Sequence, residues 1–279
     1  MPEVQPPFGA HAPTGLVARL LRATRALPTH GMGKSLGFAL RRLATMLLGG
    51  KPLDVEAYGA KFRLLPYNNV CESRILFFPR QFDEDERALL AQRMTPDFRF
   101  VDVGANIGGY ALAVAALAGP QAHILAIEPL PEIFGRLVFN VRLNPFGNLK
   151  ALELAVADKD GEMTLFIDQY NQGESSLKII TSSDGKSVRV PARRLLTVLH
   201  EEGFQRVDAL KLDVEGAEDL ILESFFAAAP EALYPGLIIL QSTPNRWQMD
   251  LLALIEGRGY VKIAETRNNI VYERGLKAD

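Results

Sequence analysis

A strand, a glycine turn and a helix follow one another in residues 98–118, and this segment most constrains the fold. Residues 98–103 are apolar enough for a buried strand, and residues 108–118 for a helix packed against it. A second strand at 123–127 and a helix at 130–143 come next, and the alternation continues toward the C-terminus. Such alternation predicts right-handed βαβ units and a mostly parallel sheet in an α/β fold.

The remaining expected elements complete this sheet. They are strands at 149–157, 207–212 and 236–241, helices at 194–202 and 216–228, an inserted pair of strands at 163–168 and 188–190, and a closing antiparallel hairpin at 259–264 and 269–273.

The turn after the first strand has the features of a nucleoside site. Asp102 and Gly104 end the strand, Gly108 starts the helix, and Glu128 ends the second strand. In doubly wound sheets the glycines let the backbone approach the ligand, and an acid at the next strand end binds two ribose hydroxyls. Asn106 stands where a dinucleotide fingerprint has its second glycine, which admits a pyrophosphate. A ligand with a ribose and no phosphate fits better, which favours S-adenosylmethionine (SAM) over NAD.

Composition argues against several classes of protein. The chain has 279 residues with 48% hydrophobic content, enough for a full α/β core and an additional segment. A net charge of −2 argues against a dedicated nucleic-acid-binding protein. The single cysteine, Cys71, excludes a disulfide framework and a thiolate metal cluster. No apolar run approaches the ~18 residues that cross a bilayer, and no secretory signal is visible, so a cytoplasmic protein is expected.

An N-terminal segment, residues 1–97, precedes the SAM-binding domain expected at 98–279. Residues 1–53 carry seven Lys or Arg and one acid, Glu3. This basic excess suits a solvated helical cap, a homodimer face or peripheral contact with an anionic membrane. The many leucines favour a packed cap or a dimer face. The elements expected here are helices at 16–27, 36–48 and 83–94 and strands or a hairpin within 55–79, at 62–65 and 74–78.

Carboxylates gather at the carboxyl ends of the expected strands, where ligands of such sheets bind. The end residues are Asp102, Glu128, Asp158, Asp213 with Glu215, and Gln241 with Ser242. Helix N-capping explains any one acid, but two acids around Val214 exceed what a cap requires. No histidine ends a strand, so a carboxylate is the expected general base, Asp213 first and Glu215 second.

A metal site is not expected, although acids around Asp213 could hold Mg²⁺ through oxygen ligands and water. The four histidines are dispersed and offer no metal triad. A second candidate region is the polar loop at 172–177, where Ser175 and Ser176 would donate hydroxyls to a substrate beneath a lid. The alternative is a surface turn. Gln241 is a further candidate for contact with the substrate.

Several motifs together resemble the FkbM-type family of SAM-dependent methyltransferases. They are Asp-Val-Gly-Ala-Asn-Ile-Gly at 102–108, Glu-Pro at 128–129, Ala-Val-Ala-Asp at 155–158 followed by Asp-Gly at 160–161, Gly-Glu-Ser-Ser-Leu at 173–177, and Lys-Leu-Asp-Val-Glu-Gly-Ala-Glu at 211–218. The resemblance covers residues 98–273 and implies a class I methyltransferase fold, with a Rossmann-like seven-stranded sheet. It also implies methyl transfer from SAM, typically to a hydroxyl of a sugar, glycolipid or natural product.

The same resemblance implies roles for single residues. Gly104, Asn106 and Gly108 would line the methionine and ribose side of SAM, together with Asp102 in the same motif. Glu128 would bind the ribose, Asp158 the adenine amine, and Asp213 would lie near the departing methyl.

We therefore expect a SAM-dependent O-methyltransferase that acts on a hydroxyl of a small-molecule or glycan acceptor. Two alternatives remain open. An NAD(P)-dependent oxidoreductase on the same sheet would need the glycine that Asn106 replaces, and no Tyr-x-x-x-Lys proton donor is visible. A non-catalytic SAM-fold binding protein would need neither the Gly104–Gly108 turn nor Glu128.

Overall fold

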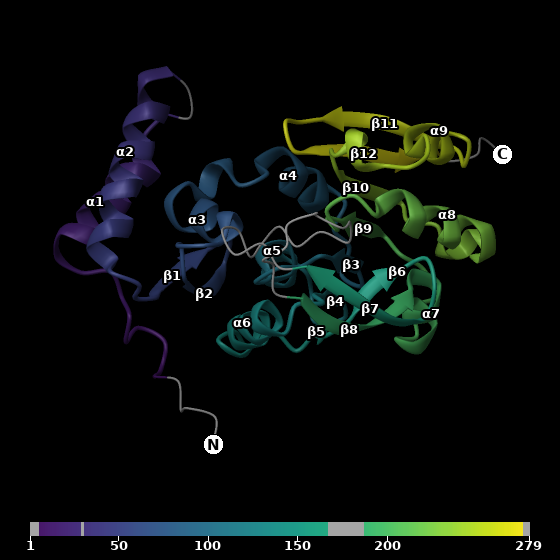
Figure 1. Cartoon of the computed structure of the whole chain (residues 1–279), viewed down its shortest axis with the longest axis horizontal. Helices are drawn as coiled ribbons and strands as arrows, with labels where there is room; N and C mark the ends of the chain where they lie inside the picture. Colours follow the sequence, from purple (N-terminus) through teal and green to yellow (C-terminus); the bar gives the residue numbers. More distant parts are fainter. Residues whose placement is uncertain (1–5, 29–30, 167–186, 276–279) are drawn as a thin grey trace.

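A seven-stranded sheet forms the centre of the computed structural model, which describes residues 6–28, 31–166 and 187–275 (Figure 1). Its strands are β3 (Arg99–Val103), β4 (His123–Ile127), β5 (Leu149–Leu152), β9 (Ala209–Leu212), β10 (Leu237–Gln241), β11 (Tyr260–Glu265) and β12 (Asn269–Arg274). Their order is β11–β12–β10–β9–β3–β4–β5. The strands from β5 to β10 are parallel, and β12 is antiparallel to both of its neighbours. The expected mostly parallel sheet with an antiparallel C-terminal hairpin is confirmed.

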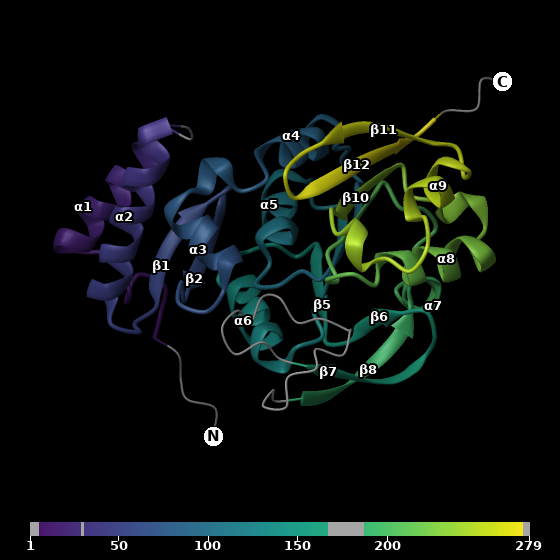
Figure 2. The same cartoon turned by 45° about the horizontal axis from the view of Figure 1, so that its top comes forward.

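Helices cover both faces of this sheet (Figure 2). They are α4 (Glu84–Gln92), α5 (Gly109–Leu117) and α6 (Pro131–Arg142) on one face, and α7 (Leu195–Glu201), α8 (Glu218–Ala228) and α9 (Leu251–Glu256) on the other. Successive side chains of a strand point to opposite faces. Phe100 accordingly packs in the core that holds Leu112 of α5, and Val101 in the core that holds Phe225 of α8.

A second sheet corrects one expectation. The sequence predicted a single strand at 149–157, but β5 ends at Leu152 and a separate strand, β6 (Ala155–Ala157), follows. The two pair with different partners, β5 with β4 and β6 with β8. The expected inserted pair is confirmed as β7 (Gly161–Phe166) and β8 (Ser187–Arg194), which are antiparallel.

The N-terminal segment contains two packed helices, a hairpin and a third helix. These are α1 (Gly15–Ala26), α2 (Gly31–Leu48), β1 (Leu53–Ala57) paired with β2 (Ala60–Leu64), and α3 (Val70–Phe77), which the turn η1 (Pro79–Gln81) joins to α4. The strand expected at 74–78 is wrong, because these residues belong to α3 and the turn after it. A run of buried apolar residues fits a strand or a helix, and here the Asn69 side chain caps a helix by accepting a hydrogen bond from the Glu72 N–H.

The N-terminal segment shares its core with the sheet. Phe62 of β2 and Ile75 of α3 belong to the same apolar cluster as Leu112 and Leu137. The division of the chain at residues 97 and 98 therefore stays a prediction. Over the described ranges, no helix is both long and apolar enough to cross a membrane.

Candidate functional site

A pocket of about 170 Å³ lies where β3, β4 and β9 end. The turn after β3, the ends of β4, β9 and β10, and part of the N-terminal segment line it. Its polar lining residues are Arg74, Asp83, Asp102, Asn106, Tyr110, Glu128, Lys211, Asp213, Glu215 and Gln241. The sequence-predicted carboxylates Asp102, Glu128, Asp213 and Glu215 thus meet at one site.

The turn after β3 requires glycine at one position and asparagine at another. Gly104 has φ of +78°, and a Cβ there would collide with the carbonyl oxygen of Asp213. Asn106 also adopts a left-handed conformation, with φ of 52°, which asparagine tolerates better than most residues. Its Oδ1 accepts hydrogen bonds from the Ile107 N–H at 2.9 Å and from Asn69 Nδ2 at 2.8 Å. The side chain of Asn106 therefore fixes the turn and connects it to the N-terminus of α3.

Two buried carboxyl groups border this turn. Asp102 Oδ2 accepts the Ala111 N–H at 3.1 Å, while its buried Oδ1 has no hydrogen-bond partner. Burial raises the pKa of Asp102 to about 6, against the opposing effect of Lys211. Glu128 accepts the backbone N–H groups of Leu130 and Asn106, at 3.0 and 2.9 Å. Burial outweighs these bonds and raises the pKa of Glu128 to about 7.

Lys211 and Asp213 form an ion pair at the end of β9, with 2.9 Å between Nζ and Oδ2. Lys211 is buried, and its Nζ lies 4.9 Å from the centre of the Tyr110 ring. Burial alone would lower the pKa of Lys211, but the carboxylates of Asp213 and Asp102 raise it above its ordinary value. About a third of the Asp213 side chain (34%) is exposed, so this carboxylate is held by the ion pair and open to the pocket.

Glu215 and Glu218, which follow Asp213, are bound to the turn formed by η3 (Pro244–Arg246) and its neighbours. Glu215 accepts Gln241 Nε2 at 2.9 Å and Arg246 Nη1 at 2.6 Å. The buried Glu218 accepts the backbone N–H groups of Val214 and Gly216. Glu218 therefore shapes the loop after β9, and Glu215 links this loop to the end of β10.

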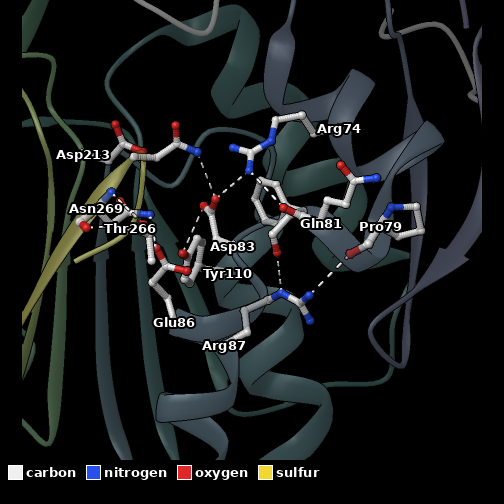
Figure 3. Close-up of polar contacts among 12 residues, drawn as sticks. Arg74, Pro79, Gln81, Asp83, Glu86, Arg87, Tyr110, Asp213, Thr266 and Asn269 are labelled. Carbon is white, nitrogen blue, oxygen red and sulfur yellow. Dashed lines mark hydrogen bonds and ion pairs between the residues drawn. The ribbon is translucent and has the colours of Figure 1, made fainter. Parts of the chain in front are cut away.

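The N-terminal segment contributes a charged group that the sequence did not reveal (Figure 3). Asp83, with φ of 43°, precedes α4 and accepts Arg74 Nη2 at 2.7 Å and the Tyr110 hydroxyl at 3.1 Å. Burial would raise the pKa of Asp83, but Arg74 outweighs it and holds that pKa below its usual range. Arg74 was hidden in the segment predicted as a strand. The sequence contained one signal, the acid Asp83 at the start of the helix predicted at 83–94. Nothing in the sequence showed that Asp83 lies close to the glycine turn in space.

Other candidate residues lie apart from this group. Asp158 is exposed and does not line the pocket, whereas Leu154, Ala155 and Val156 do. Ser175 and Ser176 lie outside the described residues. Within the described ranges, no group of three His, Cys, Asp or Glu side chains could hold a metal ion.

Comparison with known proteins agrees with this geometry. A family model described as the methyltransferase FkbM domain matches residues 102–262. Methyltransferase sdnD of Sordaria araneosa is 30% identical over 189 residues, and the match covers 57% of this chain and 72% of the relative. The 31-O-demethyl-FK506 methyltransferase FkbM of Streptomyces tacrolimicus is 28% identical over 198 residues, covering 59% of this chain and 73% of the relative.

A solved structure supports the fold alone. The METTL16 MTase domain superposes with a TM-score of 0.50 at 14% identity, covering 92% of this chain and 89% of that structure. The family match contains the glycine turn, Glu128 and the end of β9, and it covers more than half of the chain. The expected class I methyltransferase fold and methyltransferase activity are confirmed, in preference to the oxidoreductase and the non-catalytic protein. The chain belongs to the FkbM family of methyltransferases.

Proposed function

We propose that this enzyme transfers a methyl group from SAM to a hydroxyl oxygen of a small-molecule or glycan acceptor. The observation that carries the proposal is the pocket at the ends of β3, β4 and β9, where Glu128, Asp102 and Asp213 surround a turn closed to side chains at Gly104. The name of the relative from Streptomyces tacrolimicus assigns that protein to an oxygen of demethyl-FK506. That name favours oxygen as the acceptor atom here.

The pocket suits SAM in its charge. Five carboxylates line it against two cations, Arg74 and Lys211, and SAM carries a sulfonium and an ammonium. The buried Asp102 Oδ1, which has no protein partner, would accept a hydrogen bond from the ligand and so recover the cost of its burial. Glu128 would accept the two ribose hydroxyls, and Gly104 and Asn106 would line the methionine and ribose side. Gly108 precedes α5 and is not among the residues that line the pocket.

The apolar part of the pocket would hold the adenine. Leu154, Val156 and Leu165 line it and would pack against the flat ring. The family resemblance assigned Asp158 to the adenine amine. Asp158 does not line the pocket, so its carboxylate would have to reach this amine from outside the lining residues.

Asp213 is the residue that we assign as general base. Bound SAM supplies an electrophilic methyl group on its sulfonium, so the protein must align the acceptor and remove its proton. A positioned acceptor in near-attack geometry can contribute ~7–11 kcal/mol to lowering the barrier. Asp213 Oδ2 is held by Lys211 Nζ, which leaves Oδ1 to take the hydroxyl proton. Gln241, at the end of β10, would contact the acceptor, as would Ser175 and Ser176.

Calorimetric titration tests the cofactor half of the proposal. S-adenosylhomocysteine, the demethylated product, should bind with a dissociation constant in the micromolar range, roughly −8 kcal/mol, and NAD should bind more weakly. Equal or tighter binding of NAD would overturn it. Incubation with SAM and a panel of sugar and polyketide alcohols tests the second half. The expected product is a methyl ether, and an N-methylated product from an amine panel would contradict the oxygen assignment.

A further inference from the structure

The helix α2 presents an apolar stripe that no described residue covers. Leu36, Leu43, Met46 and Leu47 are all exposed, and Met46 is 70% exposed. Their spacing places them on one side of the helix, whereas the buried residues Gly37, Ala44 and Leu48 lie on another. We call these four exposed side chains the α2 stripe.

The charge around the α2 stripe is of one sign. Residues 4–53 contain seven Lys or Arg and no Asp or Glu, while the rest of the chain carries more acids than bases. Arg19 and Arg22 of α1, Arg42 of α2 and Lys51 are exposed. Arg41 lies over the Phe38 ring, with its guanidinium carbon 5.2 Å from the ring centre. The exposed part of the two helices is therefore apolar and basic together.

The two helices form one end of the molecule, and the C-terminal hairpin lies at the other (Figures 1 and 2). They are attached to α3, because Arg25 Nε donates to the Leu76 carbonyl at 2.9 Å and the Phe38 and Phe78 rings lie 5.8 Å apart. The same α3 lines the pocket with Val70 and Arg74. A surface that holds α1 and α2 would therefore be connected to the active site through one short helix.

We propose that α1 and α2 dock the enzyme on the surface of an anionic lipid bilayer. Helices that lie in a membrane interface bury an apolar side between the headgroups and place Lys and Arg against anionic lipids. Each juxtamembrane basic residue strengthens binding to anionic lipid. A second copy of the chain fits less well, because a twofold interface brings the same patch together from both subunits. The exposed cations Arg19, Arg22, Arg42 and Lys51 would then face the same cations of the other copy and repel them, because residues 4–53 contain no acid.

Flotation of the full-length protein with vesicles tests this proposal. We expect binding to vesicles of phosphatidylcholine mixed with phosphatidylglycerol, little binding to pure phosphatidylcholine, and weaker binding as salt is raised. The double variant Arg19→Gln, Arg22→Gln should lower the partition coefficient about tenfold or more. Met46→Ser with Leu47→Ser should lower it as well, because the stripe loses its apolar area.

Matched controls separate docking through α1 and α2 from non-specific adsorption of the protein to vesicles. Leu117→Ser removes an equally exposed apolar side chain on α5, and Arg267→Gln removes an exposed cation near the C-terminal hairpin; neither should change vesicle binding. Circular dichroism should show the native helix content in every variant. Absence of vesicle binding, or equal binding to neutral vesicles, would overturn the proposal. So would a dimer in light scattering that Met46→Ser with Leu47→Ser converts to a monomer, since the stripe would then belong to a second copy.

Discussion

Glu128 is a buried acid whose charge state the ligand should control. Burial raises its pKa to about 7 in the protein without ligand, so a fraction of the molecules hold a neutral carboxyl near neutral pH. The unfolded chain loses this proton at its ordinary lower pKa. This group therefore makes the free energy of unfolding fall as pH rises from the unfolded pKa toward about 7.

Ligand affinity should change with pH in the opposite direction. Ribose hydroxyls donate to the ionised carboxylate, so binding of S-adenosylhomocysteine should tighten as pH rises through the pKa of Glu128, by up to roughly tenfold per pH unit below it. Calorimetric titrations across neutral pH measure this slope. Glu128→Gln should weaken binding about tenfold or more, because hydrogen bonds to a charged group are worth ~1.5–3 kcal/mol each. It should also flatten the slope, and an unchanged slope in the variant would assign the proton to Asp102 instead.

Asp213 should matter more for turnover than for cofactor affinity. Loss of a general base typically lowers the rate by about 10²–10⁴, so Asp213→Asn should keep near-normal binding of S-adenosylhomocysteine and lose most activity. Single-turnover rates and calorimetry on the same preparation separate the two effects. Glu215→Gln is the matched comparison. Glu215 is paired with Gln241 and Arg246, so this substitution should lower turnover less than Asp213→Asn does. The reverse order of the two effects would transfer the role of base to Glu215.

At the scale of single elements, periodicity predicted the strands and helices of the sheet well. The sequence from β3 to α5 marks its own boundaries. An apolar strand followed by Gly104 and Gly108 fits few structures other than a strand, a turn and a helix. The helix α3 could not be recognised in the same way. Its buried residues 75–77 are consecutive, and such a run fits either kind of element until its packing partners are known. The pocket residue Arg74 was missed for this reason. Asp83 was missed because only the fold brings the start of α4 close to the glycine turn.

The connection between α3 and the glycine turn depends on one side chain, Asn69. Its Oδ1 accepts the Glu72 N–H at 3.2 Å, and its Nδ2 donates to Asn106 at 2.8 Å. Asn69→Ala should lose both bonds, with about 1 kcal/mol of stability lost with the helix cap and weaker binding of S-adenosylhomocysteine. Asn69→Asp keeps the capping oxygen and loses only the donor, so it should keep the thermal stability and still weaken binding. If Asn69→Asp binds like the wild type, the contact with Asn106 does not control the turn.

At the scale of the whole molecule, charge is separated along the chain. The sequence predicted a basic N-terminal segment and favoured a packed cap or a dimer face for it, but composition does not show which side chains a fold buries. In the structure, only one part of this segment contributes to the pocket. Residues from Val70 onward line the pocket, whereas α1 and α2 contribute no lining residue. Asp54 connects the two parts, because its Oδ2 accepts the Gly9 and His11 N–H groups and it pairs with the buried Arg63.

Removal of residues 1–51 should therefore separate stability from cofactor binding. The truncated protein loses two hydrogen bonds to the Asp54 carboxylate, at ~1.5–3 kcal/mol each, and uncovers Phe78, which packs against Phe38. Its thermal midpoint should fall by several degrees or more. Binding of S-adenosylhomocysteine should stay within about threefold, less than 1 kcal/mol, because every pocket residue is retained. A truncated protein that keeps its native circular dichroism but loses the ligand would show instead that α1 and α2 hold α3 in its binding position.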